Sequence, residues 1–245
     1  MGKLLKVPRR AFKRRMLAMR NGIADRSPRW ARRTFGPIVD YTDMLLVDHG
    51  IFRQIYANRH QITPLAWRSS QPSPGQIGKL ARLGVRTIVN LRGERDCGAY
   101  RLQMAACKRY GIAVEELVLK SRAAPTREQV HAAKALFERI EHPILMHCKS
   151  GADRAGLASA LYMILHEGKP VAEAIWQLSP RFGHIKQADT GIIDYFFERY
   201  LVEAERTGIG FMQWVDTVYD PATLARDFKA RGWANTLVNT ILRRE

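Results

Sequence analysis

The residues from His147 to Arg154 lie between a short apolar run and a helical pattern, and this order constrains the fold more than any other part of the chain. Residues 143–146 read Pro-Ile-Leu-Met, which favours a buried strand, and residues 155–167 have the pattern of a helix that ends before Gly168 and Pro170. We therefore expect a strand, a tight loop and a helix. Such a loop directs several backbone N–H groups and the positive end of the helix toward one point, which suits an anion.

Cys148 stands at the end of the expected strand and Arg154 follows six residues later, so both side chains should face that point. The helix dipole and the guanidinium favour the thiolate of the cysteine, and the guanidinium offers a planar pair of donors to two phosphate oxygens. Together they indicate attack on phosphorus through a phosphocysteine intermediate. The alternative is a buried cysteine in an ordinary strand–helix turn. Gly151 favours the functional interpretation, because a backbone curled around a ligand needs freedom in φ.

The His-Cys-x5-Arg pattern of residues 147–154, followed by a helix, resembles the signature loop of the cysteine-dependent protein tyrosine and dual-specificity phosphatase superfamily. Residues 67–72 and 83–92 resemble the opening strands of its smaller members. The similarity extends over residues 60–200 and is strongest to the bacterial branch of atypical dual-specificity phosphatases.

The resemblance implies a phosphoric monoester hydrolase that uses neither a metal nor another cofactor. It implies Cys148 as the nucleophile and Arg154 as the phosphate clamp. It also implies that loop amides cradle the phosphate oxygens, and these belong to Lys149, Ser150, Gly151, Ala152, Asp153 and Arg154.

Two positions depart from the family pattern. The residue after the arginine is Ala155, where many members carry a Ser or Thr whose hydroxyl steadies the leaving thiolate. Residues 119–126 correspond to the loop that often supplies the catalytic Asp, yet they contain no carboxylate. Asp153 is the nearest candidate for the general acid, and myotubularin-type lipid phosphatases carry an Asp with that role at the same loop position. The alternative is a helix N-terminal acid that interacts with the dipole; the sequence leaves both open.

A polar segment between residues 179 and 187 is a further candidate for the rim of the site. If it returns to the signature loop, His184 or Gln187 would position the hydrolytic water. The alternative is a polar entrance to the next helix, and it is the interpretation that the sequence favours.

The first 33 residues carry much of the positive charge of the chain. They contain twelve Lys or Arg and one acid, which gives +11 of the net +17. Residues 9–20 have the pattern of a basic amphipathic helix, which is typical of a membrane-surface segment or a partner helix. Packing on the domain and organelle targeting are the alternatives, and nucleic acid is not an expected partner. The apolar face of this helix consists of Phe12, Met16, Met19 and Ile23.

The remaining composition indicates the compartment. No run of residues is long and apolar enough for a membrane span. Three cysteines give no disulfide framework, and their spacing does not indicate a zinc site. We expect a cytoplasmic protein, with peripheral attachment to the inner face of the membrane as an alternative.

Strands that alternate with helices predict an α/β fold with a mainly parallel central sheet flanked by helices on both faces. We expect a basic amphipathic arm over 1–33, a phosphatase domain over 34–205, and a helical extension over 206–245 whose aromatic side chains require burial. Within the domain we expect strands at 67–69, 87–91, 112–119 and 143–146, and helices at 76–83, 101–110, 126–140, 155–167 and 194–206.

The predicted function is that of a cysteine-dependent phosphomonoesterase acting on a phosphorylated protein. A phospholipid or other polyanionic headgroup is the alternative substrate, favoured by Lys149, the basic arm and the missing loop Asp. A non-catalytic phosphate-binding membrane adaptor is a second alternative, which Ala155 would favour. The retained cysteine argues against it, because phosphate binding alone needs no nucleophile.

Overall fold

In a computed structural model of the chain, residues 29–47 and 57–242 are described. The basic amphipathic helix expected over residues 9–20 therefore lies outside the described residues. Within the described ranges no helix combines the length and the apolar character that a membrane span requires.

A five-stranded sheet forms the centre of the fold, in the order β1-β2-β5-β3-β4. Neighbouring strands from β2 to β4 are parallel, so the predicted mainly parallel sheet is confirmed. Only β1 is antiparallel; it forms a hairpin with β2 at one edge, which the sequence did not predict. The bounds are β1 His60–Thr63, β2 Ala66–Ser70, β3 Thr87–Asn90, β4 Ala113–Glu116 and β5 Ile144–Cys148.

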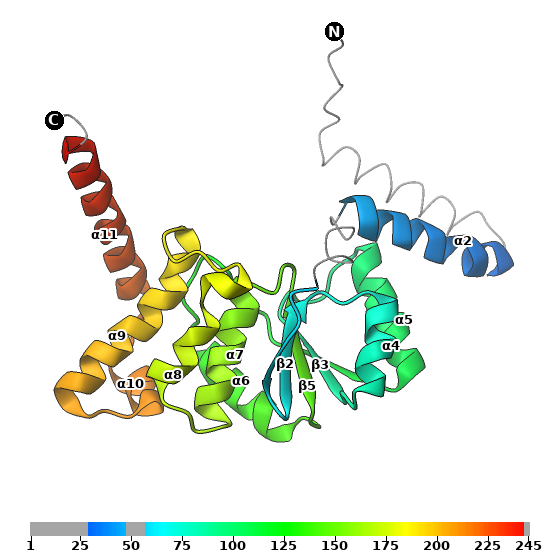
Figure 1. Cartoon of the computed structure of the whole chain (residues 1–245), viewed down its shortest axis with the longest axis horizontal. Helices are drawn as coiled ribbons and strands as arrows, with labels where there is room; N and C mark the ends of the chain where they lie inside the picture. The colour runs from blue at the N-terminus through cyan, green and yellow to red at the C-terminus, as the bar shows by residue number, and fades with distance from the viewer. Residues whose placement is uncertain (1–28, 48–56, 243–245) are drawn as a thin grey trace, which may run out of the picture.

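The central strand, β5, is buried along its whole length. Leu145 packs into a cluster with α4 (Pro74–Arg82) and α5 (Gly98–Tyr110), whereas Ile144 and Met146 pack into a larger cluster on the opposite face. This larger cluster includes α6 (Arg127–Arg139) and α7 (Asp153–Leu165), and Figure 1 shows the two helix pairs on opposite sides of the sheet. A strand covered on both faces needs apolar residues throughout, which explains the continuous apolar run.

The helix boundaries follow from local capping. Capping boxes open α4, where Ser73 pairs with Gln76, and α6, where Thr126 pairs with Gln129. Each box satisfies backbone donors at a helix start and stabilises it by about 1 kcal/mol. Gly111 closes α5 with φ of +66°, at the position that the sequence predicted.

The chain after α7 continues through short helical turns into three helices. Phe196, Phe211, Trp214 and Tyr219 form an aromatic cluster that belongs to the main core. The expected burial of the extension's aromatics is therefore confirmed for the last three of them. Beyond this cluster α11 extends away from the body of the molecule (Figure 1). The elements are α8 Val171–Ala174, η2 Ile175–Gln177, η3 Pro180–Phe182, η4 Asp189–Gly191, α9 Ile192–Thr207, α10 Phe211–Thr217 and α11 Pro221–Leu242.

The segment before the sheet is also helical. α2 (Arg29–Thr42) is followed by a π-helical turn, η1 (Asp43–Val47), and both contact α5. Arg101 forms an ion pair with Asp40 at 2.6 Å, and the backbone N–H of Gly98 donates to Asp43 at 2.5 Å. A Cβ on Gly98 would lie 2.3 Å from the carbonyl oxygen of Asp40, so this close helix approach requires glycine.

Candidate active site

The signature loop leaves the carboxyl end of the central strand. Cys148 is the last residue of β5 and is 2% exposed. The N–H of Gly151 donates to its sulfur at 3.3 Å, and α7 begins two residues later at Asp153. The helix starts earlier than the expected Ala155, which brings its positive end directly to the loop. The predicted strand, loop and helix are thus present, and Lys149 and Arg154 are half-buried around them while Ser150 is exposed.

Gly151 makes the loop's tight turn. Its φ is +78°, a conformation that side-chain-bearing residues rarely adopt. A Cβ at this position would lie 2.6 Å from the backbone nitrogen of Ser70 and 2.7 Å from the carbonyl carbon of Ser69. The loop therefore packs directly onto the end of β2, and only glycine fits there.

Arg68 holds the signature loop through hydrogen bonds to its backbone. This arginine on β2 is fully buried, and its guanidinium donates to the carbonyl oxygens of Gly151 at 2.8 Å and Ala152 at 3.0 Å. It also donates to the backbone oxygen of Gln177 at 2.5 Å and to that residue's side-chain oxygen at 2.9 Å. The ring of Phe182 covers the guanidinium at 4.1 Å. Several acceptors and an aromatic face thus compensate the burial of its charge.

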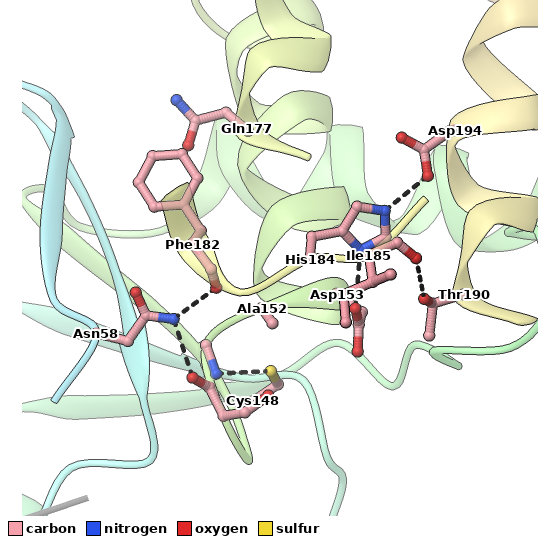
Figure 2. Close-up of polar contacts among 12 residues, drawn as sticks. Asn58, Cys148, Ala152, Asp153, Gln177, Phe182, His184, Ile185, Thr190 and Asp194 are labelled. Atoms are coloured by element: carbon pink, nitrogen blue, oxygen red, sulfur yellow. Dashed lines mark hydrogen bonds and ion pairs between the residues drawn. The ribbon is translucent and has the colours of Figure 1, made fainter. Parts of the chain in front are cut away.

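Asn58 supports the loop from the side. Its side-chain N–H₂ donates to the carbonyl oxygens of Ser150 at 3.0 Å and Phe182 at 2.9 Å (Figure 2). Its backbone has φ of +43°, a conformation in which Asn is enriched among non-glycine residues. His60 lies 3.1 Å from its side-chain oxygen; burial, followed by the charges of Arg68 and Arg181, lowers the pKa of His60.

These two supports fix the direction of the loop amides. Arg68 and Asn58 bind three consecutive loop carbonyls, those of Ser150, Gly151 and Ala152. In a trans peptide the C=O of one residue and the N–H of the next point in opposite directions. The N–H groups of residues 151, 152 and 153 therefore point away from the supports, and the first of them reaches the sulfur of Cys148. This is the geometry of a cradle for an anion.

A charged cluster stands beside the cradle. His184 is fully buried, and its Nδ1 lies 2.8 Å from Asp153 while its Nε2 lies 2.6 Å from Asp194 (Figure 2). Burial lowers the pKa of His184, but the hydrogen bonds to the two carboxylates outweigh it and raise that pKa to about 9. Asp153 thus faces a histidine that carries a proton at neutral pH.

The two candidates for positioning water lie in different surroundings. Both ring nitrogens of His184 are already bonded to carboxylates, which leaves neither for a water molecule in this arrangement. Gln187 is exposed and lines a hollow of about 270 Å³ between η4, α9 and α11. No residue of the signature loop lines this hollow.

A second hollow lies at the carboxyl end of β2. It has a volume of about 200 Å³ and contains Ser70, the register partner of Cys148 on β2. Two exposed cations, Arg59 and Lys79, line it, and its described lining includes no acid. Within the described parts of the chain, no group of three potential ligands is placed to hold a metal ion.

Residues 53–189 match a protein family described as "DSP-PTPase phosphatase fused to NAD+ Kinase". The chain belongs to this DSP-PTPase family. The match contains the whole signature loop together with Asn58, Arg68 and His184.

Two relatives and one solved structure place this DSP-PTPase among known proteins. It is 28% identical over 148 residues to the dual specificity protein phosphatase TpbA of Pseudomonas aeruginosa strain UCBPP-PA14, covering 59% of this chain and 55% of that protein. It is also 28% identical over 158 residues to a beta-lactamase hydrolase-like protein of Xylella fastidiosa, covering 63% and 33%. The chain thus spans about half the length of TpbA. The crystal structure of P. aeruginosa TpbA has a TM-score of 0.44 and 24% identity, over 55% of this chain and 81% of that one.

The loop supports of this DSP-PTPase were not among the residues that the sequence predicted. Arg68 did carry a signal, since a lone arginine in a short strand between Ala66 and Ser69 is unusual unless it is paired. Asn58 carried none, because it precedes a strand that was itself not predicted. Asp153 and His184 were both candidates, but nothing in the sequence indicated that they contact each other.

Proposed function

We propose that this protein hydrolyses phosphate monoesters through Cys148, with phosphorylated proteins as the substrate class. The observation that carries the proposal is the cradle itself, in which a cysteine at the end of the central strand receives the N–H of Gly151 on its sulfur. Membership in the DSP-PTPase family supports the reaction type, and the name of the relative TpbA supports the substrate class.

In the proposed first step, the thiolate of Cys148 attacks phosphorus and a phosphorus–sulfur bond forms. The bond from phosphorus to the leaving oxygen breaks, and Asp153 supplies a proton to that oxygen. The loop amides and the guanidinium of Arg154 hold the remaining phosphate oxygens. In the second step, water attacks phosphorus, the thiolate leaves, and the proton from water returns to Asp153.

Hydrolysis of 4-nitrophenyl phosphate by the wild type and two cysteine variants tests the nucleophile. Cys148→Ser should lower kcat by at least about a thousandfold, because serine is a weak nucleophile without an activating base. Cys97→Ser is the matched control, since Cys97 stands at the N-cap of α5, where serine is favoured. Wild-type activity should persist in a metal chelator. If Cys148→Ser keeps a substantial fraction of wild-type kcat, or Cys97→Ser loses as much, the proposed mechanism is wrong.

A phospholipid or other polyanionic headgroup is the second candidate substrate. The hollow with Arg59 and Lys79 supports it, because it contains Ser70, the register partner of Cys148, and two cations at this end of the sheet suit a substrate that carries a second anionic group. The double variant Arg59→Gln, Lys79→Gln should then lower kcat/KM for a soluble phosphoinositide headgroup by about tenfold or more. Hydrolysis of 4-nitrophenyl phosphate should stay within about twofold. Equal effects on both substrates, or a preference for a phosphotyrosine peptide that the variant does not alter, would contradict this second candidate.

A further inference from the structure

The positions of the groups that contact His184 determine how many protons the cluster around it holds. A neutral imidazole has one N–H donor and one bare nitrogen, whereas an ionised carboxylate only accepts hydrogen bonds. Carboxylates stand against both nitrogens, at 2.8 Å for Asp153 and 2.6 Å for Asp194. Both contacts are hydrogen bonds only if the cluster contains one proton more than a neutral imidazole and two carboxylates provide. The cluster of Asp153, His184 and Asp194 therefore stores a proton beside the signature loop.

The local fold keeps the imidazole between its two partners. His184 follows Gly183, which ends η3 with φ of +77°, and the turn after it is closed by the hydroxyl of Thr190, which donates to the carbonyl of Ile185 at 3.0 Å. A Cβ on Gly191 would lie 1.9 Å from the carbonyl oxygen of Lys186, so the turn has no room to rearrange there. Figure 2 shows the ring between α7, which carries Asp153, and α9, which carries Asp194.

Two charged groups govern the charge of this ring in the described part of the chain, and they are the carboxylates of Asp153 and Asp194. The side chain of Asp194 is 11% exposed and that of Asp153 is 24% exposed, so the Asp194 side of the cluster is the better shielded from water. The hydrogen bonds outweigh burial and raise the pKa of His184 to about 9. A stored proton is therefore present throughout the neutral range.

We propose that His184, anchored by Asp194, is a positioning residue that orients Asp153 and keeps a proton available to it for the leaving oxygen. The inference deepens the proposed phosphatase function and rests on it. An isolated aspartic acid keeps its proton only below about pH 4, so a lone Asp153 would be a poor acid at neutral pH. The protonated His184 supplies the proton that a lone Asp153 would lack at neutral pH.

The protons balance over the two steps. When the bond from phosphorus to the leaving oxygen breaks, the stored proton passes from Nδ1 of His184 to Asp153 and from Asp153 to that oxygen, which leaves the imidazole neutral and both carboxylates ionised. When water attacks the phosphocysteine, the electron pair of the phosphorus–sulfur bond returns to Cys148. The proton released by water passes to Asp153 and restores the imidazolium of His184.

The wild-type enzyme provides the first test. We would measure kcat/KM from pH 6 to pH 10 for 4-nitrophenyl phosphate, whose leaving group needs no proton, and for phenyl phosphate, whose leaving group does. The ratio of the two should be constant at neutral pH and rise about tenfold for each pH unit above 9, as the cluster loses its proton. A ratio that stays flat to pH 10 overturns the proposal, whereas no hydrolysis of either substrate overturns the phosphatase function instead.

Variants of the cluster provide the second test. Asp194→Asn removes one of the two charges that hold the proton, so the rise in the ratio should begin at least about one pH unit lower. At pH 8 it should lower kcat for phenyl phosphate at least tenfold and for 4-nitrophenyl phosphate less than threefold. Asp189→Asn is the matched control, because Asp189 lies in the same segment but is 80% exposed and does not contact His184. Equal losses for both substrates, or an unshifted profile, would mean that the cluster only stabilises the fold.

Discussion

Arg68 offers the sharpest test of how the loop is held, because it makes no predicted contact with substrate and yet binds two loop carbonyls. Arg68→Met keeps much of the apolar stem and removes every donor. Three acceptor oxygens, the carbonyls of Gly151 and Gln177 and the side-chain oxygen of Gln177, then lose this buried donor, whereas the carbonyl of Ala152 still accepts from the N–H of Gly156. A buried polar group left without a partner costs about 1–3 kcal/mol, so the three together set a floor of roughly 3 kcal/mol for the loss in unfolding free energy.

Arg68→Lys separates charge from geometry. An ammonium has three donors at a single point, whereas the guanidinium reaches four acceptors in one plane and stacks beneath Phe182. We expect a loss of about 1–2 kcal/mol in unfolding free energy. We also expect at least a tenfold fall in kcat/KM for 4-nitrophenyl phosphate, because a small displacement of the loop amides misplaces the phosphate.

The two assays are urea unfolding and steady-state hydrolysis of 4-nitrophenyl phosphate. The dependence of the unfolding free energy on urea concentration should be the same for all variants. Arg82→Met is the matched control, since Arg82 is an exposed arginine at the end of α4 and should change the unfolding free energy by less than about 0.5 kcal/mol. The reasoning is refuted if Arg68→Met is as stable as Arg82→Met. It is also refuted if Arg68→Lys retains full activity, because the loop would then keep its shape without the planar contacts.

Three further predictions concern other parts of the chain. Gly151→Ala should abolish activity because its Cβ collides with the end of β2, whereas Gly84→Ala, at φ of +83° but with open space around it, should only lower stability by about 1 kcal/mol in the same assays. The unfolding free energy should fall as pH rises from 6.5 through about 9, because the folded protein keeps a proton on His184 that the unfolded chain releases. At about 1.4 kcal/mol per pKa unit, the loss is roughly 3 kcal/mol. The unfolding free energy of His184→Asn should not fall in this way. Removing residues 1–28 should weaken cosedimentation with anionic vesicles, which salt should also weaken, and equal binding with and without them would exclude a membrane role for the arm.

The strand, loop and helix around Cys148 were predictable because each carries a local signal. An apolar run, a mid-loop glycine and a helical pattern stand next to one another in the sequence, and the sheet's parallel order follows from their alternation with other helices. The hairpin of β1 and β2 was not predictable in the same way, because β1 reads His-Gln-Ile-Thr and lies at a partly exposed edge. A strand that buries little of its surface shows no apolar pattern.

The contacts that hold the signature loop could not be predicted from local sequence patterns, for a different physical reason. Asn58 lies 124 residues from Phe182, and Arg68 lies 83 residues from Gly151, so their partners are set by the fold and not by spacing. Both side chains also bind backbone carbonyl groups. Every residue has such a group, so the sequence does not show which one is bound. A polar side chain that orients a loop through its carbonyls becomes visible only when the strands are in register. The direction of the loop amides in this protein therefore depends on how the strands pair. The chemistry of the anion cradle can be predicted from residues 147–154 alone.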